Sequence, residues 1–145
     1  MSWTVSRSWQ APNLISTACS VGSELLVSTG LDVILLDEDT NPRWKKELPF
    51  RVHAAAHASG KIGILFGHGF HLLRASDGSQ VGEGRSTTSG FSDLLARPGG
   101  GWVLSCRQGQ LHVFNQEGRG LKRLAVGGVR RLVGWFDREH LMWQD

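Results

Sequence analysis

The chain contains one pattern three times and the beginning of a fourth copy. Each copy has a short apolar run, a turn that contains glycine, and a second short apolar run. The complete copies cover 22–37, 60–74 and 101–115, a spacing of about 40 residues, and the fourth starts at Val129. A repeat of this length constrains the fold, because one unit cannot bury its apolar face alone and must stack on its neighbours.

The apolar runs have the signature of β-strands. They are bounded by Gly, Asp, Asn and Ser, as in 21–23, 77–78 and 98–101. Continuous apolar runs indicate strands covered on both faces, which is typical of small sheets stacked as the blades of a β-propeller. We therefore predict an all-β fold with blades of four antiparallel strands, about three complete blades plus a partial one.

The strand order divides the chain as a single β-propeller-type domain. The predicted parts are an N-terminal strand (2–10), blade 1 (11–49), blade 2 (50–89), blade 3 (90–128) and a partial blade 4 (129–145). The small side chains of 53–57 suit a strand that crowds the central axis, so we expect the first strand of each blade to be innermost. The N-terminal strand precedes the innermost strand of blade 1. By this place in the order it corresponds to the outermost strand of a blade whose other strands are missing.

The segment Val33–Trp44 resembles the repeat of the quinoprotein-type (PQQ-like) propellers, with Asp37, Thr40 and Trp44 at comparable places. The stretches 73–78 and 114–118 match the turn of that repeat but lack the tryptophan. The related WD-like repeat would need Trp-Asp and Gly-His pairs, which are absent in that form. The resemblance implies blade architecture and transfers no active site, because function lies in sites built on folds.

The residues predict no catalytic, cofactor or metal site, so we expect a protein that is not an enzyme and holds no cofactor. His53 and His57 would be roughly 13 Å apart on a strand, too far to share one ion. The quinoprotein enzymes that the repeat resembles bind a quinone and a calcium ion in the central pocket of the ring. The acidic turn 37–39 is expected to lie away from that pocket. No nucleophile elbow or phosphate-binding glycine motif occurs.

The charge pattern leaves three alternatives open. The formal net charge is +3, and the stretch 118–136 contains Arg119, Lys122 and Arg123 without an acidic residue. Such a run is most simply a solvated edge with alternate side chains outward. It could instead meet phosphates of a nucleic acid, although it lacks the interleaved aromatics of single-strand binders, or it could meet the acidic turn 37–39 of a second copy. A small-molecule or glycan-binding propeller is a further alternative, disfavoured by the divergence of the repeats.

Two sets of loops are expected to form the face that binds a partner: those between second and third strands, and those between consecutive blades. The side chains there that could anchor a partner, a role in which arginine is frequent, are Asp32, Arg51, His68, Arg85, Arg107, Arg130 and Arg131. The unfinished blade 4 admits three explanations: association with another copy, membership of a longer protein, or an imperfectly closed ring. We favour a self-associating interaction module, because symmetric closure removes exposed strand edges.

Cellular location is an expectation from composition. Cys19 and Cys106 lie in different repeats and predict no disulfide framework. The first ten residues lack the apolar core of a signal peptide, and the longest aliphatic run, Val33–Leu36, is far too short for a membrane span. We therefore expect a cytoplasmic protein with no membrane partner.

Overall fold

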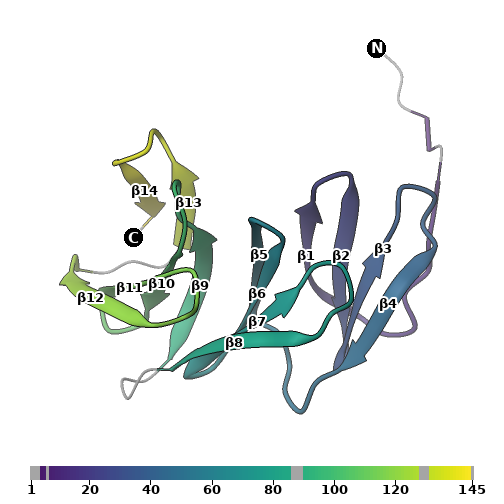
Figure 1. Cartoon of the computed structure of the whole chain (residues 1–145), viewed down its shortest axis with the longest axis horizontal. Helices are drawn as coiled ribbons and strands as arrows, with labels where there is room; N and C mark the ends of the chain where they lie inside the picture. Colours follow the sequence, from purple (N-terminus) through teal and green to yellow (C-terminus); the bar gives the residue numbers. More distant parts are fainter. Residues whose placement is uncertain (1–3, 6, 86–89, 128–130, 145) are drawn as a thin grey trace.

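The computed structural model describes residues 4–5, 7–85, 90–127 and 131–144. Within them every regular element is a β-strand, arranged as three four-stranded antiparallel sheets and one two-stranded sheet (Figure 1). The sheets follow one another along an open arc. The predicted fold class, with three complete blades and a partial one, is confirmed.

Each blade is an up-and-down meander of consecutive strands. Blade 1 consists of β1 (Ile15–Val21), β2 (Glu24–Thr29), β3 (Asp32–Leu36) and β4 (Pro42–Glu47). Blade 2 consists of β5 (Ala54–Ala58), β6 (Lys61–Phe66), β7 (Gly69–Arg74) and β8 (Gln80–Arg85). Blade 3 consists of β9 (Phe91–Ala96), β10 (Trp102–Cys106), β11 (Gln110–Phe114) and β12 (Gly120–Ala125). The half-blade is the hairpin of β13 (Arg131–Trp135) and β14 (Leu141–Gln144).

The first strand of each blade is the innermost one, as predicted. β1 contacts β5, β5 contacts β9, and β9 contacts β13. The central strand of these, β5, has the sequence Ala-Ala-Ala-His-Ala, and small side chains let neighbouring blades approach closely.

Apolar layers between the blades form the core. Leu26, Leu35 and Ile64 are among the side chains buried between blades 1 and 2. Phe70 and Trp102 anchor the layer between blades 2 and 3, and both are almost completely buried. The second and third strands of a blade contribute side chains to the apolar layers on both of its faces. Their continuous apolar runs follow directly from this packing.

A tryptophan joins the outer strand of blade 1 to the turn before β8 of blade 2. Trp44 on β4 donates its indole N–H to the Ala75 carbonyl oxygen of blade 2 at 2.8 Å. Its ring lies directly on Gly78, where a Cβ would come within 2.7 Å of the indole. Lys46 adds a 3.2 Å hydrogen bond to the Gly78 carbonyl oxygen. The tryptophan of the quinoprotein-like segment therefore joins two blades.

Blades 2 and 3 make the corresponding contact without a large side chain. Leu35 pairs with Trp44 in blade 1, and Leu72 pairs with Gly82 at the equivalent place in blade 2. Because Gly82 has no side chain, the backbone of β8 approaches the turn of blade 3 directly. A Cβ on Gly82 would lie 2.9 Å from the Glu117 carbonyl oxygen. Glycine is required here by close approach of two backbones.

The N-terminal segment forms no strand in its described residues, 4–5 and 7–10. It follows the free side of blade 1 instead (Figure 1). Trp9 packs against the buried Val27, Ile34 and Leu36, and Arg7 pairs with Asp39 at 3.2 Å. The segment thus covers the apolar face that a preceding blade would cover in a ring.

The half-blade is fastened to blade 3 by two hydrogen bonds at its inner strand. The Asp93 carboxylate accepts from the Leu132 amide at 2.9 Å, and the Trp135 indole donates to the Ala96 carbonyl oxygen at 2.7 Å. Leu132 is buried in a small cluster with Val103 of blade 3. β13 and β14 therefore occupy the two innermost positions of a fourth blade.

Candidate interaction surfaces

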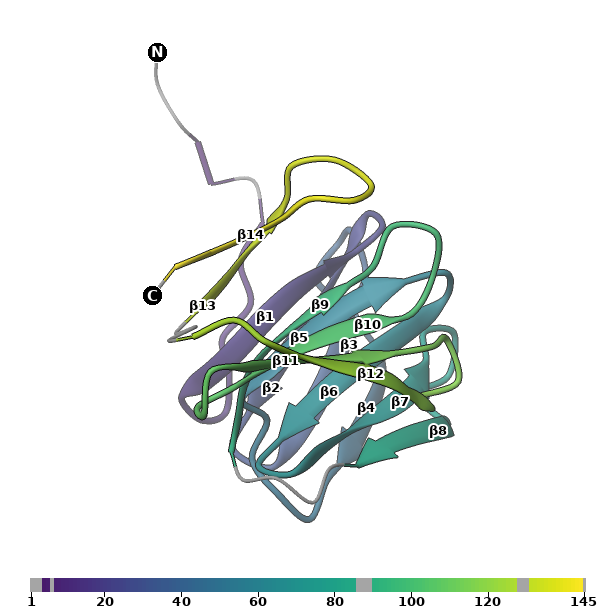
Figure 2. The ribbon, with the colours of Figure 1, turned by 90° about the vertical axis from the view of Figure 1, so that its left-hand side faces the viewer.

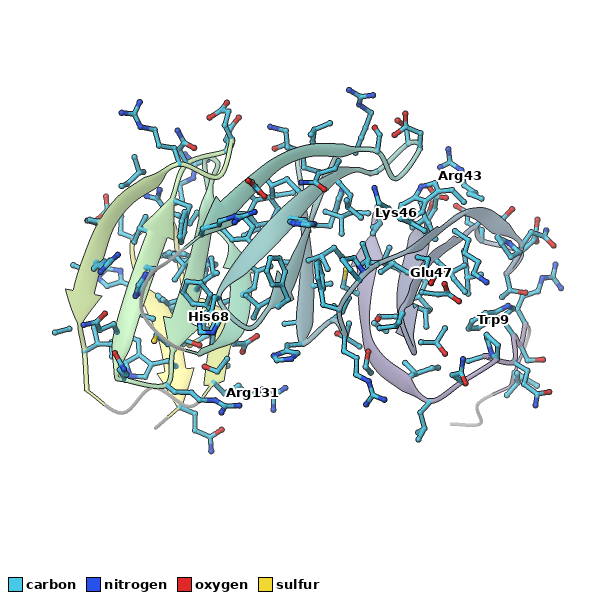
Figure 3. All side chains as sticks on the ribbon, turned by 90° about the horizontal axis from the view of Figure 1, so that it is seen from below. Trp9, Arg43, Lys46, Glu47, His68 and Arg131 are labelled. Carbon is cyan, nitrogen blue, oxygen red and sulfur yellow. The ribbon has the colours of Figure 1, made fainter. Side chains whose placement is uncertain are left out.

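Three of the predicted anchor residues can be placed in turns or at the start of a strand. His68 lies in the β6–β7 turn, Arg107 in the β10–β11 turn and Arg131 at the start of β13, and all three are exposed. Figure 3 shows His68 and Arg131 on one side of the ribbon and Arg43, which follows the β3–β4 turn, on the other. Arg130 lies outside the described residues.

Two of the predicted residues, Asp32 and Arg51, share a depression at the free end of blade 1. Its volume is about 670 Å³, and its walls also include Lys45 and Glu47. Asp32 is held by an ion pair to Lys45, with 3.1 Å between Nζ and Oδ2. The depression therefore carries side chains of both signs of charge.

Arg85 belongs to a different site. It lines a cavity of about 250 Å³ together with His112, Lys122 and Arg123 of blade 3. The sequence marked Lys122 and Arg123 only as part of a basic run and did not place Arg85 beside them. The repeat order gave only a coarse signal, since it places β8 and β12 on consecutive blades. The predicted residues therefore do not form one continuous site.

The histidines have individual environments. His71 packs edge-on against Phe50 and Phe66, and burial lowers the pKa of its imidazole. His140 bonds Asp137 in the β13–β14 turn, with 2.7 Å between Nδ1 and Oδ2. Across the described ranges, no three His, Cys, Asp or Glu side chains converge on a point where they could hold a metal ion.

Exposed large apolar side chains gather at the two ends of the arc. Within the described residues, blade 2 exposes only Val81 and blade 3 exposes Leu121 and Leu124, all on outermost strands. The N-terminal segment and blade 1 expose Val5, Leu14, Ile15, Leu25 and Leu31, and the half-blade exposes Val133, Phe136, Met142 and Trp143. Exposed apolar patches of this kind mark protein interaction surfaces.

Comparison with known proteins identifies the architecture. The chain matches no protein-family model and no curated protein. Solved structures do match, and the similarity extends over most of the chain. BBS1N, crystallised with ARL6DN, superimposes with a TM-score of 0.82 at 10% identity and covers 97% of this chain. This is a β-propeller-type fold.

Two further structures give the same result. BamB from Moraxella catarrhalis superimposes with a TM-score of 0.69 at 19% identity over 80% of this chain. Sqt1 from Saccharomyces cerevisiae superimposes with a TM-score of 0.73 at 10% identity over 90% of it. The chain spans 38% of the BamB structure, 40% of Sqt1 and 51% of BBS1N, so it corresponds to an arc of each.

No helix among the described residues could span a membrane.

Proposed function

We propose that this chain is a non-catalytic β-propeller-type interaction module that closes its ring with a second copy and presents loops to a protein partner. The distribution of exposed apolar side chains carries the proposal. They concentrate on the N-terminal segment, blade 1 and the half-blade, which are the two ends of the arc where a further blade would stack. Among the described residues of the complete blades 2 and 3, which lie between these ends, such side chains are Val81, Leu121 and Leu124, all on outermost strands.

The geometry of the ends supports a second copy as the partner. β13 presents a free innermost strand, and β1 presents another, so the succession β1, β5, β9, β13 can continue onto β1 of a second chain. The free face of blade 1 carries Leu25, and the hairpin carries Met142, each more than two-fifths exposed. Two copies placed head to tail around one axis bury both surfaces at both junctions, which is how a closed ring avoids open edges.

The N-terminal segment fits this arrangement. Arg7 and Trp9 hold it on the free face of blade 1, much as β4 lies on blade 2 through Trp44. In the proposed ring it lies beside the half-blade of the second copy and supplies one of the two strand positions that the half-blade lacks. The quinoprotein-like assignment of the repeat is part of the same proposal and is supported by the contact between Trp44 and Gly78.

Substituting Met142→Asp tests the self-association. Burying a carboxylate at an apolar contact without a partner is costly, so the dissociation constant of the dimer is expected to rise about 30-fold. Light scattering over a concentration series measures it. Val81→Asp is the matched control, because Val81 is similarly exposed but lies on the outer strand of blade 2. A wild-type chain that is monomeric and folded at every concentration would sink the proposal.

We further propose that the protein acts in a reducing compartment such as the cytoplasm. The two cysteines, Cys19 and Cys106, lie in different blades and are not joined in a disulfide, and burial raises the pKa of the Cys19 thiol to about 11. In a Cys106→Ala variant at pH 8, Cys19 should react with a disulfide reagent about 100-fold more slowly than an ordinary thiol, because the thiolate is the nucleophile. Reaction of the same variant in urea provides the reference rate. Equal rates in both conditions would contradict the burial of Cys19.

A further inference from the structure

A small cationic cavity lies on β11 and β12 of blade 3, beside the end of β8 of blade 2. Its volume is about 250 Å³. Arg85 at the end of β8 lines it from blade 2, while Lys122 and Arg123 on β12 line it from blade 3. Figures 1 and 2 show β8 and β12 as outer strands of neighbouring blades. The cavity therefore combines cations that are far apart in the sequence.

The charges around the cavity are unbalanced. Of the residues that the structure describes, no carboxylate lines it. Arg85 contacts Glu83 at 3.3 Å, but three-quarters of its side chain is exposed, and such a pair is weak. Within the described part of the chain, neither Lys122 nor Arg123 forms an ion pair with a carboxylate. Arginine side chains without a carboxylate partner leave donors available for a planar or tetrahedral anion.

The pKa of a buried histidine, His112, responds to the positive charge at the cavity. His112 lies opposite Arg123 in the β11–β12 pairing and is almost fully buried, with its ring edge against Phe91. Burial lowers the pKa of its imidazole, and the charge of Arg123 lowers it further. Its Nε2 lies 3.3 Å from the Gln110 side-chain oxygen. An anion in the cavity would oppose the effect of Arg123 and raise this pKa.

We propose that this cavity binds a single phosphate group in its dianionic form. The volume is below the range of about 300–1,000 Å³ that is usual for pockets that enclose a whole small molecule, so it suits a group rather than a nucleotide. A phosphate monoester carries a charge of about −1.5 to −2 at pH 7 and several strong acceptor oxygens. Cations from two blades can converge on such a compact charge, whereas a phosphodiester offers one charge per group.

Titration of the whole chain with inorganic phosphate at fixed ionic strength tests the proposal. The probe should shift the ring resonances of His112 and raise its pKa, with saturation of both effects. Arg85→Gln and Arg123→Gln should each weaken phosphate binding about tenfold, since each removes charge-assisted hydrogen bonds. Arg107→Gln is the control: it removes the same charge from an exposed turn that does not line the cavity, and it should leave the affinity unchanged.

The source of the phosphate is separated by two further probes. If phosphoserine binds with at least the affinity of inorganic phosphate, the ligand is a phosphorylated side chain of a partner. If inorganic phosphate binds more tightly than phosphoserine, the ligand is the free ion. Equal weakening of phosphate binding by Arg107→Gln and Arg123→Gln, or tighter binding of a phosphodiester oligonucleotide, would show a diffuse basic surface and overturn the proposal. Both arginine variants must retain the wild-type urea midpoint, which exposed positions on outer strands should allow.

Discussion

Trp44→Ala is expected to lower the free energy of unfolding by about 3 kcal/mol. The indole lies on Gly78 and against the layer between blades 1 and 2, and its N–H bonds the Ala75 carbonyl oxygen. Removal deletes this apolar contact and leaves the carbonyl without its donor. Urea unfolding followed by circular dichroism measures the loss.

Trp44→Phe separates the two contributions. Phenylalanine retains a ring on Gly78 but cannot donate to Ala75, so the expected loss is about 1 kcal/mol, the usual net value of one hydrogen bond. Because blades contact only their neighbours, a weakened junction should also lower the cooperativity of unfolding, with blade 1 separating first. Equal stability of Trp44→Ala and the wild type would refute the assignment of Trp44 as the link between blades.

Gly118→Ala is expected to cost a similar amount, about 3 kcal/mol, from backbone strain and overpacking together. Gly118 has a φ of +88°, a conformation that L side chains rarely adopt, and an added Cβ would lie 2.5 Å from the Glu83 carbonyl oxygen of blade 2. Neither backbone can retreat without opening the contact between blades 2 and 3. Thermal and urea unfolding both measure this effect.

Gly60→Ala is the matched control for this prediction. Gly60 has a φ of +73°, but no atom lies within 4 Å of an added Cβ. Only the strain remains, so the expected cost is about 1 kcal/mol. The difference between the losses of unfolding free energy in the two variants measures the effect of overpacking the contact between blades 2 and 3. If both variants lost the same stability, the close approach of Gly118 to β8 would be excluded.

The sequence predicted the strands because each blade repeats the same pattern of an apolar run, a turn with glycine and a second apolar run. The repeat copy 60–74 contains β6 and β7, and the copy 101–115 contains β10 and β11. Turn residues such as Gly60 mark these bounds directly. The innermost position of β5 could also be predicted from the sequence, because its small side chains suit a strand that lies close to the neighbouring blades.

The sites were less predictable, because they depend on contacts between blades. Nothing near Arg85 in the sequence indicates Arg123, which approaches it only through the stacking of blades 2 and 3. Similarly, Trp44 was recognisable as a repeat residue, but its acceptor, the Ala75 carbonyl, is a backbone atom and carries no sequence signal. The N-terminal segment was predicted as a strand from its order alone, whereas its position depends on Trp9 and the uncovered face of blade 1.

The different junctions on the two sides of blade 2 have a consequence for how each can be altered. The turn before β8 receives the indole of Trp44, while β8 itself brings its backbone at Gly82 against the turn of blade 3. The first junction can therefore be altered in steps through the size of one side chain, whereas the second is fixed by contact between two backbones and leaves no room for a side chain.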